Sequence, residues 1–320
     1  MEHLPVLSRE VQEYLGLKGG EVVADLTLGL GGHAMDSLKA IGEKGTLIGF
    51  DQDERNLQEA KKRLGNAKNT IFFHDNFCHL KSRLTGSGIE GVDAVLLDLG
   101  LSSPHVDEAE RGFSFIKDGP LDMRFDLRTK LTAADVVNAY SEGDLSRIFF
   151  KYGEEKLGNK FARMITERRK TKAFVTTKDL ADFLEGLVPK KYRGKSHPAT
   201  QVFQALRIEV NNELGVLEDV LRQVAEVLNV GGRVVLISYH SLEDRIVKQF
   251  FKDLERPAAR GDEAIYSNFG EAIFESLIKK PVGPSNEELQ MNPRSRSAKL
   301  RAYKKIKTLP LNFFENVGSH

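Results

Sequence analysis

The stretch Val22-Val23-Ala24-Asp25-Leu26-Thr27-Leu28-Gly29-Leu30-Gly31-Gly32-His33 decides the fold. An apolar run leads into a glycine-rich turn, and a helical pattern over His33–Ala40 follows. Glycine adopts positive φ at little cost and carries no Cβ, so backbone in such a turn can approach a bound nucleoside or phosphate closely. The order of strand, glycine turn and helix therefore predicts a ligand-binding turn in an α/β fold.

An acidic residue follows at a distance that supports this interpretation. The second apolar run, Thr46–Phe50, ends in Asp51, which lies 20 residues after Gly31. In nucleotide-binding α/β folds, an acid at about this separation accepts hydrogen bonds from ribose hydroxyls. The pattern Asp-x-x-x-Gly-x-Gly-Gly, with Asp25 at the end of the first strand, departs from the dinucleotide fingerprint. It is more similar to the first motif of S-adenosylmethionine methyltransferases than to a nicotinamide site.

Composition is that of an ordinary globular protein. The chain has 320 residues, of which 40% are hydrophobic and 29% charged, enough for one large domain or two smaller ones. The net charge of +1 excludes a globally basic protein but allows local basic patches. Cys78 is the only cysteine, so the chain can form neither an intrachain disulfide nor a cysteine zinc cluster, and we expect no metal. Without a signal-peptide core or a bilayer-length apolar run, we expect a cytoplasmic protein with no membrane attachment.

Strands and helices alternate over the first third of the chain, which predicts a mostly parallel sheet with helices on both faces. The expected strands are Val22–Ala24, Thr46–Phe50, Thr70–Phe73 and Ala94–Leu97, and the expected helices are His33–Ala40, Glu54–Leu64 and Cys78–Leu84. A short helix over Ser8–Leu15, capped by Ser8, precedes them.

The alternation stops after Asp98, and a helical region follows. Helices are predicted over Ala133–Val137, Glu142–Phe150, Lys156–Lys170 and Thr177–Leu187, the last with its N-cap at Thr177. We expect residues 106–204 to form a helical insertion between two parts of one α/β domain, residues 1–105 and 205–320.

The last third returns to the α/β pattern. Helices are predicted over Thr200–Leu214, Val216–Leu228 and Ser241–Leu254, a glycine cap at Asn229-Val230-Gly231-Gly232, a strand over Arg233–Tyr239, and a closing pair of strands over Phe274–Lys279 and Lys299–Lys304.

Nine segments, in order along nearly the whole chain, resemble the RsmH (MraW) family of ribosomal RNA small-subunit methyltransferases. They are Asp25–His33, Leu97–Pro104, Arg111–Phe115, Asp118–Arg124, Tyr152–Glu155, His197–Thr200, Phe203–Arg207, Ser238–Arg245 and Asn292–Ser297. The resemblance implies a class I S-adenosylmethionine-dependent methyltransferase fold interrupted by a helical domain. It also implies N4-methylation of a cytidine in the decoding region of 16S rRNA, within the small ribosomal subunit. The oligomeric state stays open, and a homodimer is one possibility.

The resemblance also implies which residues contact S-adenosylmethionine: Gly31, Gly32, His33, Asp51, Phe77, Asp98 and His105. Structural alternatives exist for three of them. His33 could make a local hydrogen bond at a helix start, Asp51 could be a polar strand end, and Phe77 could be plain core. His105 stands where the family commonly has glutamine, and an imidazole would add a pH dependence that an amide lacks.

Methylation of an exocyclic amine needs an acceptor for the amine hydrogens, because the nitrogen lone pair is delocalised into the ring. Asp98, Ser102 and Ser103 follow the fourth strand and are candidate catalytic residues. No strong general base is required if the proton leaves after methyl transfer, and positioning for in-line attack then supplies most of the rate gain.

Basic clusters are the candidate RNA contacts, with solvated surface as the alternative for each. The candidates are Arg168, Arg169 and Lys170, then Lys191 and Arg193, and then Arg294 and Arg296 in the tail. Asn211, Ser238 and His240 are further candidates for binding the substrate. Two other classes of function remain at this point: a nicotinamide enzyme that uses the glycine turn, and an rRNA-binding assembly factor without catalysis.

Overall fold

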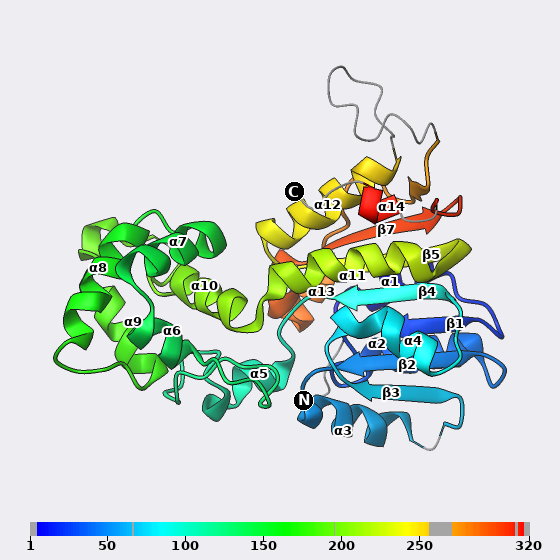
Figure 1. Cartoon of the computed structure of the whole chain (residues 1–320). Coiled ribbons are helices and arrows are strands. Elements are labelled where there is room, and N and C mark those ends of the chain that lie inside the picture. Colours follow the sequence, from blue (N-terminus) through cyan, green and yellow to red (C-terminus); the bar gives the residue numbers. More distant parts are fainter. Residues whose placement is uncertain (1–4, 66, 195, 256–270, 311–312, 317–320) are drawn as a thin grey trace. The chain divides into compact units, whose positions relative to one another are not determined.

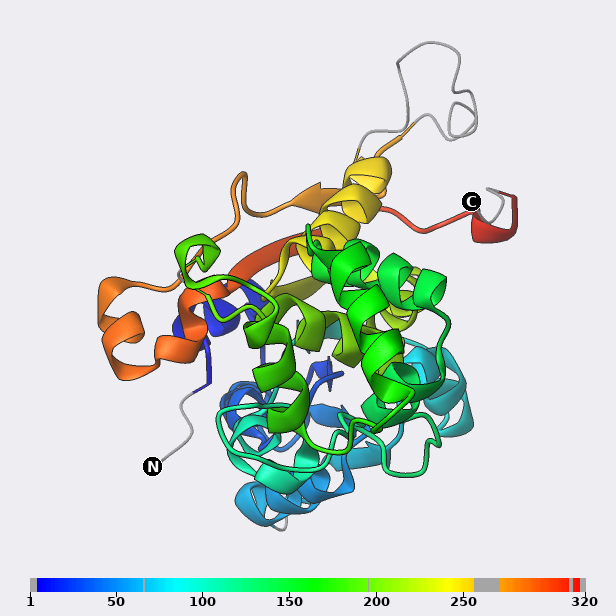
Figure 2. The same ribbon diagram turned by 90° about the vertical axis from the view of Figure 1, so that its left-hand side faces the viewer.

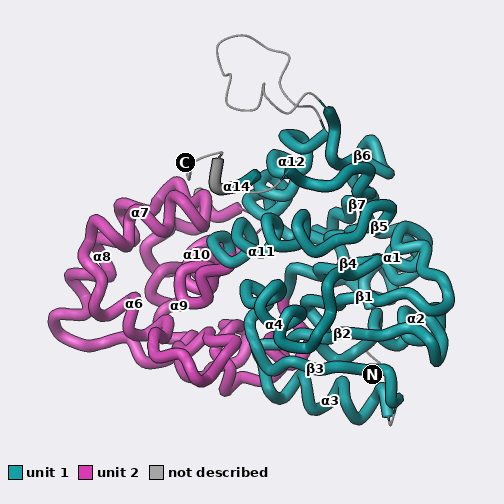
Figure 3. The backbone as a smooth tube through the Cα atoms, turned by 45° about the vertical axis from the view of Figure 1, so that its right-hand side comes forward, with its two compact units in different colours: residues 1–100, 214–320 teal, residues 101–213 magenta. Residues whose placement is uncertain are grey.

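The computed structural model describes residues 5–65, 67–194, 196–255, 271–310 and 313–316, and the chain divides into two compact units. Unit 1 comprises residues 1–100 and 214–320, and unit 2 comprises residues 101–213 (Figure 3). The insertion predicted at residues 106–204 falls inside unit 2. We describe each unit by itself.

Unit 1 is built on a sheet that has seven strands among the described residues, in the order β3-β2-β1-β4-β5-β7-β6 (Figure 1). The strands are β1 (Val22–Asp25), β2 (Thr46–Asp51), β3 (Thr70–His74), β4 (Val92–Asp98), β5 (Leu228–Ser238), β6 (Phe274–Ser276) and β7 (Lys299–Lys305). The first five pair in parallel, and β7 pairs antiparallel with both β5 and β6. The strand order reverses between β1 and β4, and in open α/β sheets ligands bind beyond the carboxyl ends of the strands at such a point.

Helices cover both faces of this sheet. They are α1 (Ser8–Leu15), α2 (Gly32–Ile41), α3 (Glu54–Leu64), α4 (Leu80–Gly86), α11 (Glu213–Val227), α12 (Ser241–Glu255), α13 (Asn286–Met291) and α14 (Phe313–Asn316), with short 3-10 turns η1 (Phe77–His79) and η5 (Pro293–Ser297). Among the described residues, no helix has both the length and the apolar character that crossing a bilayer requires.

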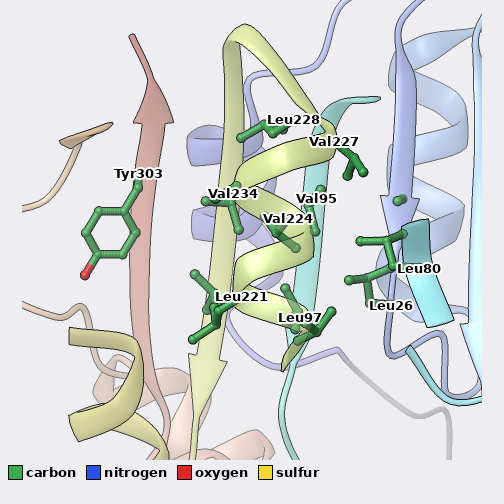
Figure 4. Close-up of a cluster of buried hydrophobic side chains, with 14 of the residues drawn as sticks. Leu26, Leu80, Val95, Leu97, Leu221, Val224, Val227, Leu228, Val234 and Tyr303 are labelled. Carbon is green, nitrogen blue, oxygen red and sulfur yellow. The ribbon is translucent and has the colours of Figure 1, made fainter. Parts of the chain in front are cut away.

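Side chains that alternate along each strand contribute to two hydrophobic clusters, one on each face of the sheet. Leu47 belongs to the hydrophobic cluster with α1, α2 and α3, whereas its neighbour Ile48 belongs to the cluster with α4, α11 and α12. Successive side chains of a strand point to opposite faces, so a strand covered on both sides must be apolar throughout. Figure 4 shows the second cluster, where Leu221 and Val224 of α11 pack toward Val95 and Val234 of the sheet.

The predicted glycine cap at Asn229-Val230-Gly231-Gly232 is wrong, because these residues belong to β5. Val92 pairs with Leu228, whereas Ala94 pairs with Arg233, so the register shifts between these two pairs. The extra residues of β5 form an irregularity in the ladder, and Gly231 takes a φ of +90° within it. β5 therefore begins directly after α11 ends. β6 is also shorter than the strand predicted for Phe274–Lys279.

The predicted cap of α1 is also wrong. The N-cap is Leu7, with a φ of +52°, and no side chain caps the helix there. Ser8 instead donates from Oγ to Asp36 Oδ2 at 3.1 Å. The Leu7 N–H donates to Glu288 Oε1 of α13 at 2.7 Å, so a segment from the far end of the chain holds the start of α1 (Figure 2).

Among its described residues, unit 2 consists of helices and the loops between them, with an isolated bridge between Pro120 and Thr176. Its helices are α5 (Ser103–Asp107), α6 (Ala133–Ala139), α7 (Glu142–Gly153), α8 (Gly158–Arg169), α9 (Thr177–Gly186) and α10 (Thr200–Asn211), with short turns η2 (Ala109–Arg111) and η3 (Lys190–Tyr192). α10 is shorter than predicted, because Asn212 adopts a left-handed φ of +48°. The N-cap of α9 is Thr176 rather than Thr177.

A buried lysine joins α11 to β7 in unit 1. Lys305 is 3% exposed, and its Nζ donates to the carbonyl oxygens of Ala225 and Leu228, each at 2.7 Å. Ala225 lies in the last turn of α11, whose carbonyls have no partner within the helix, and Leu228 begins β5, so this ammonium group ties the end of the helix to the start of the strand. Burial lowers the pKa of Lys305.

We therefore expect Lys305→Met to lower the free energy of unfolding by about 1–3 kcal/mol, because it removes a charged donor from two buried carbonyls. Urea unfolding would measure the change. Lys304→Met is the matched control, since Lys304 is only half-buried and lies near Glu275 at 3.6 Å. Equal stability of the two variants would show that the Lys305 contacts contribute nothing.

Candidate functional site

Three carboxylates mark the ends of three neighbouring parallel strands. Asp25 ends β1, Asp51 ends β2 and Asp98 ends β4. Because β2, β1 and β4 are adjacent and parallel, their carboxyl ends lie at one edge of the sheet. This edge includes the point where the strand order reverses, so the candidate site lies there.

The glycine turn after β1 has the geometry that its sequence predicts. Gly31 has a φ of +76° and is the N-cap of α2. A Cβ on Gly31 would lie 3.3 Å from the Cβ of Ala60 on α3, so the turn needs glycine for both conformation and packing. The N–H of Gly29 donates to Asp51 Oδ2 at 2.9 Å, which ties the turn to the end of β2. Gly32 lies at the start of α2, against Pro5.

Asp51 is held by backbone and amide donors. Besides Gly29, it accepts from the N–H of Asp53 at 2.8 Å and from Asn56 Nδ2 at 3.4 Å. Burial raises the pKa of Asp51 to about 7, and the hydrogen bonds only partly oppose this. Each carboxylate oxygen has two lone pairs, so Asp51 can still accept from a vicinal diol.

His33 lies between acids in the interior. Its side chain is 7% exposed, and neither ring nitrogen has a hydrogen-bond partner among the described residues. Its Nε2 lies 3.7 Å from Asp98 Oδ2. Burial raises the pKa of Asp25 to about 6, and the nearby His33 opposes this rise. The local hydrogen bond considered as the alternative for His33 is not found in the described part of the chain. Buried polar groups without partners are uncommon and point to a ligand contact.

Asp98 is fixed from two sides. Its backbone N–H donates to Thr27 Oγ1 at 2.6 Å, and its Oδ1 accepts from the hydroxyl of Tyr239 at 2.8 Å. Tyr239 directly follows β5 and was not among the residues predicted from sequence. The segment Ser238–Arg245 contained the only signal for it.

The loop after β3 carries Phe77, which is half-buried and packs against the cluster of Figure 4. Asp75 organises this loop: it accepts from the N–H of Asn76 at 2.9 Å and pairs with His79 and Arg83. The ring of Phe77 is neither fully buried nor fully exposed, so its contact with adenine stays a prediction.

Ser102, Ser103 and His105 belong to unit 2, at the start of α5. His105 is 4% exposed, with its ring centroid 5.0 Å from that of Phe113 and 4.9 Å from that of Phe125. Its Nδ1 accepts from the N–H of Ser102 at 3.2 Å. This imidazole therefore has a structural role in unit 2, and its contact with the cofactor stays a prediction.

Asn211 also has structural contacts in unit 2. Its Oδ1 accepts from the N–H of Phe125 at 2.9 Å, and its Nδ2 donates to the carbonyls of Met123 and Arg207. These bonds fix the loop at residues 123–125, and a contact of Asn211 with the substrate stays a prediction.

Three of the basic candidates likewise serve the fold of unit 2. Arg168 pairs with Asp179 at 2.6 Å and lies over the ring of Phe174 at 3.9 Å. Arg169 donates to the carbonyls of Val137 and Tyr140, each at 2.6 Å, at the end of α6. Arg193 donates to Glu185 and to the carbonyl of Val188 near the end of α9.

The remaining substrate candidates differ in exposure. Lys170, Lys191, Arg294 and Arg296 are exposed, and Lys170 pairs with Glu167. Ser238 is buried, and its Oγ lies 3.5 Å from the carbonyl oxygen of Lys299. His240 is mostly buried, with Nε2 at 3.1 Å from Glu243 Oε1.

The strand order, with an antiparallel β7 beside a parallel set, and the acids at the reversal point define the class I methyltransferase fold. The family model described as the MraW methylase family matches residues 1–306, and the chain belongs to this family. The family assignment confirms the resemblance and removes the nicotinamide enzyme from consideration.

Several named proteins are similar to this chain over nearly its whole length. Ribosomal RNA small subunit methyltransferase H of Clostridium botulinum (strain Loch Maree / Type A3) is 44% identical over 306 residues, covering 95% of this chain and 99% of that protein. The protein of the same name from Clostridioides difficile (strain 630) is 43% identical over 314 residues, with the same coverage. A crystal structure of an rRNA methylase from Streptococcus thermophilus aligns at a TM-score of 0.43 and 12% identity, covering 96% of this chain and 100% of that one.

The chain is an S-adenosylmethionine-dependent methyltransferase. The residues at the sheet edge fit this cofactor. Asp51 can accept from its ribose hydroxyls, the glycine turn allows close approach, and the carboxylates near His33 suit its positive charge. The position of each contact stays a prediction.

We expect Asp51 to give the affinity for S-adenosylmethionine a pH dependence. Ribose hydroxyls donate to the ionised carboxylate, so affinity should rise as pH increases from about 6 to about 8, and this rise should be smaller in Asp51→Asn, where, of these two acids, only Asp25 still titrates. Titration calorimetry at both pH values would measure it. Asp25 titrates in both proteins, so their difference isolates Asp51.

The stability of the unliganded protein depends on pH in the opposite direction. The pKa of Asp51 is raised above its ordinary value of 3.8, so its contribution to stability is full below that pH and is lost as pH rises through about 7. If cofactor affinity changed equally with pH in the wild type and in Asp51→Asn, the assignment of Asp51 would be contradicted.

Arg169→Ala should destabilise unit 2 by about 1–3 kcal/mol, because two helix-end carbonyls lose their charged donor. Thermal unfolding would measure the change, and cofactor affinity should be retained. Lys170→Ala is the matched control, because its side chain is exposed. A loss of RNA affinity in Arg169→Ala at unchanged stability would instead assign this side chain to the RNA.

Proposed function

We propose that this enzyme methylates N4 of a specific cytidine in the decoding region of 16S rRNA, within the small ribosomal subunit. The observation that carries the proposal is the similarity to proteins named Ribosomal RNA small subunit methyltransferase H, at 43–44% identity over 95% of the chain. An enzyme with this substrate acts where small subunits are found, so we also propose a cytoplasmic location.

The geometry of Asp98 supports an exocyclic amine as the acceptor. S-adenosylmethionine supplies an electrophilic methyl group when it is bound. With Oδ1 engaged by Tyr239, the Oδ2 oxygen of Asp98 can accept one hydrogen of the amine and orient the nitrogen for in-line attack. After transfer, the same oxygen can receive the proton that the nitrogen loses. Ser102 and Ser103 remain candidates for a second acceptor.

The cysteine content supports the same choice of atom. Enzymes that methylate the C5 carbon of cytosine by a covalent route need a cysteine nucleophile at the site. Cys78 is the only cysteine of the chain and lies in η1, after β3. Burial raises the pKa of its thiol, which reduces the thiolate fraction. The residues present therefore favour transfer to an amine over transfer to a ring carbon.

Exposed basic residues support RNA as the partner. Lys170 and Lys191 of unit 2, and Arg294 and Arg296 of unit 1, are the candidates whose side chains reach solvent. Contacts of lysine and arginine with phosphates release counterions, so binding through them would weaken with salt. Arg168, Arg169 and Arg193 already make contacts within unit 2, so we rank the exposed residues ahead of them as RNA contacts.

The test is to incubate the purified enzyme with labelled S-adenosylmethionine and small subunits from cells that lack this gene. The RNA is then digested, and the labelled nucleoside is identified by mass spectrometry. We expect N4-methylcytidine at one position, with turnover lost in Asp98→Ala at saturating cofactor. Label on a ring carbon, on ribose or on protein alone would contradict the proposal. RNA binding with no transfer at all would favour the assembly factor.

A further inference from the structure

We propose that Tyr239 is the positioning residue for Asp98, and that the pair makes the site select an acceptor that carries an N–H donor. The inference rests on the proposed function and adds a residue and a criterion for the acceptor. All the residues that carry it belong to unit 1.

The two side chains come from neighbouring strands. Asp98 pairs in register with Ile237, two residues before Tyr239. The Tyr239 hydroxyl donates to Asp98 Oδ1 at 2.8 Å, while the N–H of Asp98 is held by Thr27 at 2.6 Å. The carboxylate is therefore fixed at its backbone and at one oxygen. The other oxygen, Oδ2, is the one that lies 3.7 Å from His33.

The ring of Tyr239 is itself fixed. A Cβ on Gly100 would lie 2.8 Å from Cε2 and 3.0 Å from Cδ2 of this ring, so the ring occupies the space that a side chain at residue 100 would fill. The N–H groups of Tyr239 and His240 both donate to Glu243 Oε2, at 2.9 and 3.2 Å. Glu243 is 4% exposed, so this turn is anchored in the interior.

The arrangement determines what Oδ2 can bind. Burial and the adjacent Asp98 carboxylate raise the pKa of Tyr239, so its hydroxyl stays protonated and donates. A carboxylate held in this way presents an acceptor at Oδ2. An amine of cytosine can donate to it, whereas the carbonyl oxygen of a keto base would face a negative charge and be repelled. The hydroxyl thus acts on the substrate through Asp98.

Tyr239→Phe keeps the ring against Gly100 and removes only the hydroxyl. We expect kcat to fall roughly 10- to 100-fold, the usual consequence of losing one hydrogen bond to a charged group, while cofactor Kd and the KM for small subunits change less than about twofold. Tyr303→Phe is the matched control. Tyr303 is a buried tyrosine of β7 that pairs with Val234 of β5, away from the end of β5 that Tyr239 follows. Removal of the Tyr303 hydroxyl should leave kcat unchanged.

A double-mutant cycle with Asp98→Asn separates positioning from a general structural effect. If Tyr239 acts through Asp98, Tyr239→Phe should lower kcat no further in the Asp98→Asn background. An unchanged kcat in Tyr239→Phe overturns the inference. The inference is also overturned if the loss of activity in Tyr239→Phe comes entirely from weaker cofactor binding or from a lower melting temperature. It is overturned as well if the losses of kcat in Tyr239→Phe and Asp98→Asn multiply in the double variant.

Failure of the proposed function is recognised separately. If the wild-type enzyme places its label on an atom other than N4 of cytidine, the proposed function fails. If that atom also carries no hydrogen, the inference that the site selects an N–H donor fails with it. The ratio of kcat between Tyr239→Phe and the wild type on that acceptor still tests the positioning role, and a ratio near one overturns it.

Discussion

Unit 1 depends on the reversal of strand order between β1 and β4. The chain builds β1, β2 and β3 in one direction across the sheet, and then returns to place β4 on the other side of β1. Connections on the two sides of such a point leave toward opposite faces, and in open α/β sheets ligands bind at the carboxyl ends of the strands there. Asp25 and the glycine turn lie at the end of β1, and Asp98 lies at the end of β4, so the strand order brings them to the same place. A different strand order would separate the same residues, however well each local motif were retained.

The buried acids carry an energetic cost that the local structure offsets in part. Burial raises the pKa of both Asp25 and Asp51, because a charged carboxylate loses its hydration. Backbone N–H groups of Gly29 and Asp53 compensate for some of that loss at Asp51. Groups with this balance favour a partner that brings positive charge and hydroxyl donors. S-adenosylmethionine brings both, in agreement with the predicted contacts at this sheet edge.

Much of unit 1 could be predicted because its signals are local. The alternation of apolar runs and helices predicted the parallel sheet, and the glycine turn with Asp51 predicted the sheet edge that forms the candidate site. The β5 irregularity at residues 229–232 could not be predicted, because a glycine pair after a helix more often ends it than starts a strand. Arg168 and Arg169 were interpreted from charge alone, whereas their partners lie 11 to 32 residues away along the chain. Tyr239 was missed because its role depends on a contact with a residue 141 positions earlier.

The position of unit 2 within the chain has a consequence for how the protein folds. Unit 2 is one continuous segment with its own hydrophobic cluster, whereas unit 1 is made from two segments that flank it. The pairing of β4 with β5 therefore has to close a loop that contains all of unit 2. Closing a long flexible loop costs entropy, and a loop that is already compact costs less. We expect unit 2 to acquire its structure early, and the sheet of unit 1 to be completed only when β5 has been synthesised.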